Sequence, residues 1–158
     1  VGTISSLWEA NMEVLDPEHS GIDIFDENWK IYSRNSGMTG HKIGSNAVVE
    51  NSMITDGCRI DGSIKHSILF SGVRVEKGAK IEDAVVMGKT VIKAGAVVEH
   101  CIVAENVVIG ENAVVGSMPK GEGHGVATIG SGITIGKGAK IGPNAMVNKN
   151  VEDGEEQW

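Results

Sequence analysis

The chain has 158 residues and a formal net charge of −7 at pH 7, and no run of Lys or Arg occurs in it. This charge pattern argues against nucleic-acid binding through a basic face. Glycine accounts for 22 residues, about twice its usual share, whereas aromatic residues make up only 4%. The composition therefore predicts a narrow core of aliphatic side chains, with glycine at frequent corners.

The two cysteines and the lack of a recognisable targeting segment predict a cytoplasmic location. Cys58 and Cys101 are far apart and lack the spacing of metal ligands, so we interpret them as reduced thiols of a cytoplasmic protein. We find no signal peptide and no apolar run long enough to span a bilayer. The chain begins at Val1 without Met, and we expect it to be part of a longer protein.

Residues 1–40 do not repeat, and we expect them to begin with a helix. Ser5 and Ser6 followed by Glu9 predict an N-cap with a capping box. The apolar residues that follow predict a helix over residues 6–16, which Pro17 ends. We expect the apolar side of this helix to pack on a preceding domain.

The rest of this first segment is predicted to be a connection. Residues 22–25 and 29–33 are predicted to be short extended pieces rich in aromatic side chains. Residues 33–40 are predicted to link them to the repeats that follow.

Residues 41–153 carry a six-residue repeat, followed by a polar tail over residues 154–158. The clearest units open with an aliphatic residue and carry Ile, Ala or Val four positions later. These units open at Ile129, Ile135, Ile141 and Val147.

The period of the repeat indicates the fold. Side chains alternate sides along a strand, so the opening aliphatic residue and the one four positions later both point inward. Gly or Asn between them tolerates a positive φ at a corner. Three units then form one triangular coil, and coils stack with parallel pairing. A helix is excluded because six residues do not match its 3.6-residue turn.

The repeat resembles that of the hexapeptide-repeat proteins. The resemblance implies an all-β fold, a single-stranded left-handed parallel β-helix, preceded here by a short helix. The handedness comes from the resemblance, because the periodicity does not determine it.

A loop over residues 117–127 interrupts the repeat, with Pro119 and several glycines. It is either a tolerated surface insertion or a loop that reaches a neighbouring subunit or a site. We expect each of the five histidines to be a solvent-facing corner residue. His124 in the loop is the best candidate for the general base of a hexapeptide acyltransferase.

The segment before the repeats is the most specific part of the sequence. It contains Val-Gly-Thr at residues 1–3, Trp-Glu-Ala-Asn-Met at residues 8–12 and Trp-Lys-Ile-Tyr at residues 29–32. These motifs closely resemble the junction between the two domains of bacterial glucose-1-phosphate adenylyltransferases, the ADP-glucose pyrophosphorylases. The resemblance continues through His66–Val73 and covers essentially the whole chain except the loop.

The resemblance implies a function for the longer protein. Such enzymes make ADP-glucose and pyrophosphate from ATP and glucose 1-phosphate with Mg²⁺, for glycogen synthesis. Their catalytic domain precedes a β-helix that supports assembly of a homotetramer and allosteric regulation. We therefore expect the partners to be the chain's own catalytic domain and further copies. The chain alone should be inactive and should hold no catalytic residue, metal or cofactor.

Basic residues near the start of the repeats are the candidate regulatory site. In the resembled enzymes anionic effectors bind near the domain interface, and positive side chains there bind phosphate. The candidates are Arg34, Lys42, Arg59, Lys65 and Arg74.

Two other functions remain open from the sequence. One is a free-standing acyltransferase of the hexapeptide type, and the other is the β-helix domain of a different sugar-phosphate nucleotidyltransferase. The Val-Gly-Thr and Trp-Glu-Ala-Asn-Met motifs favour the ADP-glucose-forming enzyme, and its catalytic subunit over a non-catalytic sister subunit.

Overall fold

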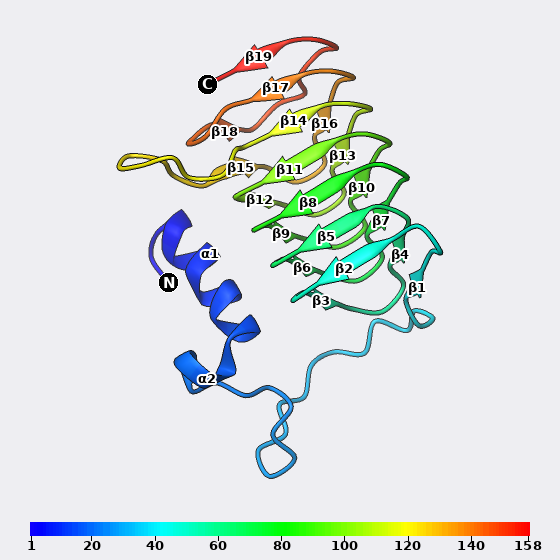
Figure 1. Cartoon of the computed structure of the whole chain (residues 1–158), viewed down its shortest axis with the longest axis vertical. Coiled ribbons are helices and arrows are strands. Elements are labelled where there is room, and N and C mark those ends of the chain that lie inside the picture. Colours follow the sequence, from blue (N-terminus) through cyan, green and yellow to red (C-terminus); the bar gives the residue numbers. More distant parts are fainter.

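A computed structural model describes residues 1–158, and it confirms the predicted class, a parallel β-helix of hexapeptide repeats with a short N-terminal helical segment (Figure 1). The helical segment consists of α1 (Ile4–Met12), the 3₁₀ turn η1 (Glu13–Leu15) and α2 (Pro17–Ser20). No helix has the length and apolarity needed to cross a bilayer.

Nineteen short strands form three parallel sheets, and each strand pairs with strands one coil away. Sheet A consists, in spatial order, of β1 (Lys42–Ile43), β4 (Arg59–Ile60), β7 (Arg74–Val75), β10 (Val91–Ile92), β13 (Val108–Ile109) and β16 (Thr134–Ile135). Sheet B consists of β2 (Val48–Glu50), β5 (Ser63–Lys65), β8 (Lys80–Glu82), β11 (Val97–Glu99), β14 (Val114–Val115), β17 (Lys140–Ile141) and β19 (Glu156–Gln157). Sheet C consists of β3 (Met53–Ile54), β6 (Ile68–Leu69), β9 (Val85–Val86), β12 (Cys101–Val103), β15 (Ala127–Ile129) and β18 (Met146–Val147).

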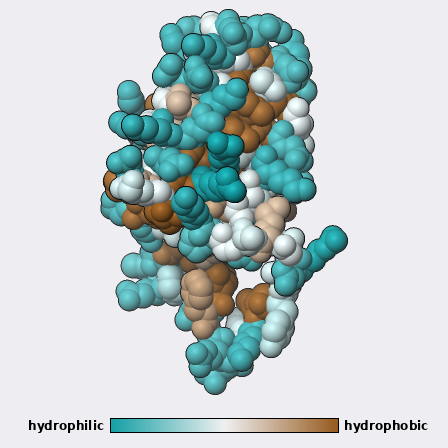
Figure 2. Space-filling view, turned by 90° about the vertical axis from the view of Figure 1, so that its right-hand side faces the viewer, coloured by the Kyte–Doolittle hydropathy of each residue, from teal (hydrophilic) through white to brown (hydrophobic).

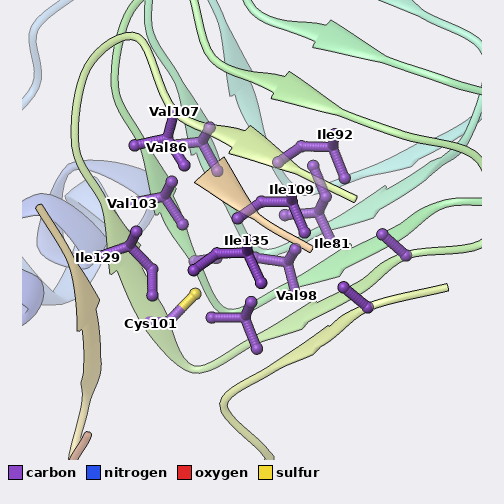
Figure 3. Packing of buried hydrophobic residues seen from close by; sticks show 14 of the residues in the cluster. Ile81, Val86, Ile92, Val98, Cys101, Val103, Val107, Ile109, Ile129 and Ile135 are labelled. Carbon is purple, nitrogen blue, oxygen red and sulfur yellow. The ribbon is translucent and has the colours of Figure 1, made fainter. Parts of the chain in front are cut away.

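The core is a column of aliphatic side chains inside the three sheets. The inward residues of successive coils lie in register, as Ile92 with Ile109 in sheet A and Val98 with Val115 in sheet B. All four are fully buried, and Figure 3 shows how side chains from all three sheets meet inside the coil. Each strand is short, so stability depends on the stacking of coils and not on any one strand.

Both cysteines belong to this core. Cys101 lies among the inward side chains in Figure 3, and Cys58 occupies a corner two coils away; neither forms a disulfide. Burial in apolar surroundings raises the pKa of both thiols. They are therefore structural residues with little thiolate at neutral pH.

The corner between sheets B and C is shorter than the repeat predicts. Its inward residues are five positions apart, as Val98 and Val103 are, whereas those across other corners, such as Val103 and Ile109, are six apart. A non-glycine residue with positive φ closes this corner in four successive coils. These residues are Asn51, His66, Asp83 and His100, with φ between 38° and 59°.

The N-terminal helix differs from the prediction in its cap and in its packing. The N-cap is Thr3, whose hydroxyl accepts from the Ser6 amide, so the predicted cap at Ser5 or Ser6 with Glu9 is wrong. Its apolar side packs on the outer face of sheet C, where Met12 contacts the cluster of Val85 and Ile102. Figure 1 shows α1 along that face.

The two ends of the chain also carry structure that the repeat does not predict. The tail over residues 154–158 contains β19, which pairs with β17 and extends sheet B. Residues 22–40 contain no strand, and turns occur at residues 24–25 and 27–28, within and beside the predicted extended pieces.

Gly116, where the chain leaves sheet B for the loop over residues 117–127, should be sensitive to substitution. Its φ is +71°, and a Cβ there would clash with the carbonyl oxygen of Glu99 in the coil below. Gly132 has the same φ but open space around it. We expect Gly116→Ala to lower the free energy of unfolding by about 3 kcal/mol and Gly132→Ala by about 1 kcal/mol. Chemical denaturation measures both, and equal losses would contradict the clash.

Candidate functional site

The outer face of sheet A carries three cations in adjacent strands, which we call the cation ladder: Lys42, Arg59 and Arg74. The register pairs Lys42 with Arg59 and Arg59 with Arg74. Neighbouring strands lie about 4.8 Å apart, so the three side chains emerge one above another. The next position upward is Val91, so the charge is confined to the first three strands.

The cation ladder borders a hollow of about 380 Å³ that Gly40, Gly57 and Asp61 also line. All three cations are exposed, and none has a carboxylate within ion-pair distance. Like charges directly opposite on neighbouring strands repel one another. An anion with several oxygens would relieve this repulsion and accept from both guanidinium groups.

The other two predicted regulatory residues lie elsewhere. Lys65 is on sheet B, where its ammonium is 3.4 Å from a carboxylate oxygen of Glu82. Arg34 lines a separate hollow of about 440 Å³ beside Lys89 and Glu105. The structure thus brings three of the five candidates together and separates the remaining two from them.

A second polar cluster lies at the short corner between sheets B and C, and we call it the His–Asp–His clasp: His66, Asp83 and His100. One carboxylate oxygen of Asp83 is 2.7 Å from Nδ1 of His66, and the other is 2.7 Å from Nδ1 of His100. Because a carboxylate only accepts, each ring donates its Nδ1–H. Asp83 and His100 are buried, whereas His66 is partly exposed.

The His–Asp–His clasp is joined to α1 through Trp8. The indole N–H of Trp8 donates to the carbonyl oxygen of Asp83 at 2.8 Å. The ring of Trp8 lies 4.6 Å from the ring of His100, centroid to centroid. The expectation that His100 faces solvent is therefore wrong, because α1 covers it.

The sequence holds a signal for this cluster that histidine counting alone misses. His66, Asp83 and His100 are spaced 17 residues apart, which is the length of one coil here. Residues one coil apart stack on the same corner, so this spacing places a carboxylate between two imidazoles.

The loop over residues 117–127 folds back beside the His–Asp–His clasp. Nε2 of His124 lies 3.0 Å from Oγ and 2.9 Å from the carbonyl oxygen of Ser117, and its ring is 6.4 Å from that of His100. The side chain of Asn144 also donates to the carbonyl oxygen of Gly123. The Nε2 atom of His124 is thus engaged within the loop, which does not favour its use as a general base.

The residues of the chain do not form a metal centre. No group of three or more His, Cys, Asp or Glu side chains is arranged to hold a metal ion. The Nδ1 atoms of both clasp histidines are occupied by Asp83. The cation ladder therefore presents unpaired positive charge, and the His–Asp–His clasp contacts α1 through Trp8.

Replacement of Asp83 should loosen α1 without unfolding the coils. In Asp83→Asn one imidazole N–H faces an amide N–H₂ group, so we expect a loss of about 2 kcal/mol in unfolding free energy. Hydrogen exchange of the α1 amides should accelerate more than exchange in sheet A. The matched control is Glu82→Gln, which changes a neighbouring, more exposed carboxylate; equal effects of the two variants would refute the role of the clasp.

Comparison with known proteins agrees with this architecture. Residues 36–136, more than half of the chain, match the family described as GlmU-like, C-terminal hexapeptide. A stretch of 82 residues is 45% identical to glucose-1-phosphate adenylyltransferase of Geobacillus stearothermophilus, covering 52% of this chain and 21% of that protein. The resemblance to these enzymes is thereby confirmed, over about a fifth of that relative's length.

The fold of this chain also resembles one solved structure. The acetyltransferase domain of PglB from Neisseria gonorrhoeae FA1090 superimposes with a TM-score of 0.37 and 22% identity, over 77% of this chain and 55% of that one. The sequence match and the stacked coils together identify the chain as a member of the GlmU-like, C-terminal hexapeptide family, a β-helix domain that is similar in sequence to part of a glucose-1-phosphate adenylyltransferase.

Proposed function

We propose that this chain is the regulatory and assembly domain of an enzyme that makes ADP-glucose and pyrophosphate from ATP and glucose 1-phosphate. The observation that carries the proposal is the 45% identity to a glucose-1-phosphate adenylyltransferase over 82 residues. The sequence motifs before the β-helix add support, since they match the domain junction of such enzymes. Nucleotidyl transfer would take place in the domain that precedes this chain, with Mg²⁺ and ATP.

The acyltransferase alternative has weaker support. Its best candidate base, His124, is held by Ser117 on its own loop. No carboxylate is hydrogen-bonded to its other ring nitrogen to orient it. We therefore favour the nucleotidyltransferase.

An activity assay on the longer protein that contains this chain tests the proposal. With ATP, glucose 1-phosphate and Mg²⁺, we expect pyrophosphate release, and we expect none from the 158-residue chain. Assays with other sugar phosphates and with acetyl-CoA plus an amine acceptor serve as comparisons. Preference for another sugar phosphate assigns the chain to a different nucleotidyltransferase, and acetyl transfer would overturn the proposal.

The cation ladder is the part of the proposed regulatory site with the best geometry. Lys42, Arg59 and Arg74 lie in register without acidic ion-pair partners. This arrangement suits an effector that carries phosphate or several carboxylate groups. Arg34 and Lys65 lie outside this hollow. An effector bound to the cation ladder would therefore reach them only through an additional contact.

Phosphate binding to the chain tests the cation ladder. We expect inorganic phosphate, titrated while amide NMR shifts are followed, to move the signals of Gly57 and Arg59 most. Arg59→Ala with Arg74→Ala should weaken binding at least tenfold, and added salt should weaken it further. The control, Lys137→Ala with Lys140→Ala, removes two cations that are already paired with Glu111 and Glu156. Equal weakening by both double variants would exclude a specific site.

A further inference from the structure

The helical segment and the His–Asp–His clasp border a common hollow of about 400 Å³. Three carboxylates of the helical segment line it, and we call them the acidic rim: Glu9, Glu13 and Asp16. His66 lines the same hollow from the coil side. No Lys or Arg is among the lining residues, so imidazoles are the only groups in the hollow that can carry positive charge.

When these imidazoles are uncharged, the contact between the helical segment and the coils holds an excess of negative charge. On the coil side the carboxylate of Asp83 lies 2.7 Å from Nδ1 of His66. On the side of the helical segment the acidic rim adds three further carboxylates. Like charges on the two partners of a contact repel each other, so this distribution weakens docking of the helical segment.

A proton on His66 converts this repulsion into attraction. Imidazole is the side chain that changes its charge between pH 5 and 8, and the side chain of His66 is 37% exposed, so solvent reaches it while α1 is docked. A charged ring keeps its bond to Asp83, because Nδ1 donates in both states. The pKa of the Asp16 carboxyl is lowered chiefly by its hydrogen bond with His19, and a charged His66 adds to this effect.

The other groups around the clasp do not take over this role. His100 lies under Trp8 and its side chain is only 9% exposed, so a charge on it would lose water on docking and would oppose docking. Lys65 pairs with Glu82 on sheet B. The remaining titratable groups near the clasp are Glu50, Glu99 and Cys101 on the coils, His124 in the loop, and Asp16 and His19, which pair with each other.

We propose that the His–Asp–His clasp is a pH-sensitive lock for the helical segment. A proton taken up by His66 strengthens docking of α1 on sheet C, and loss of that proton weakens it. Because docking takes up a proton, the docked population falls as the pH rises through the range in which imidazole loses its charge. The lock thus couples the position of α1 to the acidity of the surroundings.

The indole proton of Trp8 reports on docking. It is donated to the carbonyl oxygen of Asp83 at 2.8 Å, so it exchanges with water when α1 opens. Trp158 is 79% exposed, and division by its indole exchange rate in the same NMR sample removes the intrinsic dependence on pH. For a partly exposed charge contact, we expect the ratio of the Trp8 rate to the Trp158 rate to rise at least about threefold from pH 6 to pH 8. A smaller rise, or a fall, would overturn the proposal.

Replacement of single histidines tests whether His66 is the responsible group. Asn51 occupies the same corner one coil below with a similar positive φ, so Asn is the matched neutral replacement. His66→Asn should remove more than half of the rise. His19→Asn removes an imidazole whose partner Asp16 lies on its own segment, and it should keep more than half. The opposite result for either variant would refute the role of His66.

Neutralising the acidic rim tests the partner of this charge. Glu9→Gln with Glu13→Gln removes the repulsion at pH 8 and the attraction at pH 6, so more than half of the rise should disappear. The matched control, Glu18→Gln with Glu27→Gln, removes two exposed carboxylates outside the hollow and should keep the rise. Equal effects of the two double variants would exclude the acidic rim.

Sheet A provides the check that each variant is folded. The side of the coils away from the helical segment, shown in Figure 2, is largely hydrophilic and carries no helix. Docking of α1 therefore leaves this side unchanged. The amide signals of Ile92 and Ile109, which are paired in sheet A, should be the same in all variants.

Discussion

The parallel register between coils is the constraint on which the rest of this molecule depends. Each inner strand pairs with the strand one coil above and one coil below, so its residues have neighbours of equivalent position about 4.8 Å away. Inward positions give a continuous aliphatic column, as in Ile92 and Ile109. Outward positions give the cation ladder, and the corner positions give the His–Asp–His clasp. One register thus creates the core and both polar clusters.

The repeat predicts the coil, the three sheets and the inward aliphatic residues, because alternation along a strand depends only on local sequence. It does not predict the five-residue step between Val98 and Val103. That step needs a residue with positive φ, and His100 supplies it at a cost that Gly would avoid. The shortened corner places three polar side chains where they can stack. Local sequence patterns do not reveal this unfavourable backbone conformation, because the contacts that offset its cost come from the coils above and below.

The cation ladder and the His–Asp–His clasp can be predicted from the sequence to different degrees. The basic residues of the cation ladder can each be chosen by charge, but their adjacency follows only from the pairing of Lys42 with Arg59 and Arg59 with Arg74. The role of His100 depends on Trp8, which is distant in the chain. Similarly, the cap at Thr3 depends on a local hydrogen bond with Ser6 that competes with other good caps nearby. A single sequence gives least information on long-range packing and on the choice among several suitable cap residues.

The contact between Trp8 and Asp83 joins residues 75 positions apart, and this separation has a kinetic consequence. Helix α1 is made early during synthesis, but its binding surface on sheet C exists only after β9 and β12 have formed. Until then the helix is too short to be stable alone, and its apolar side remains available to other surfaces. Closure of so long a segment is slow compared with the local pairing of coils. Docking of α1 should therefore be a late folding step, and Trp8 is its natural fluorescent reporter.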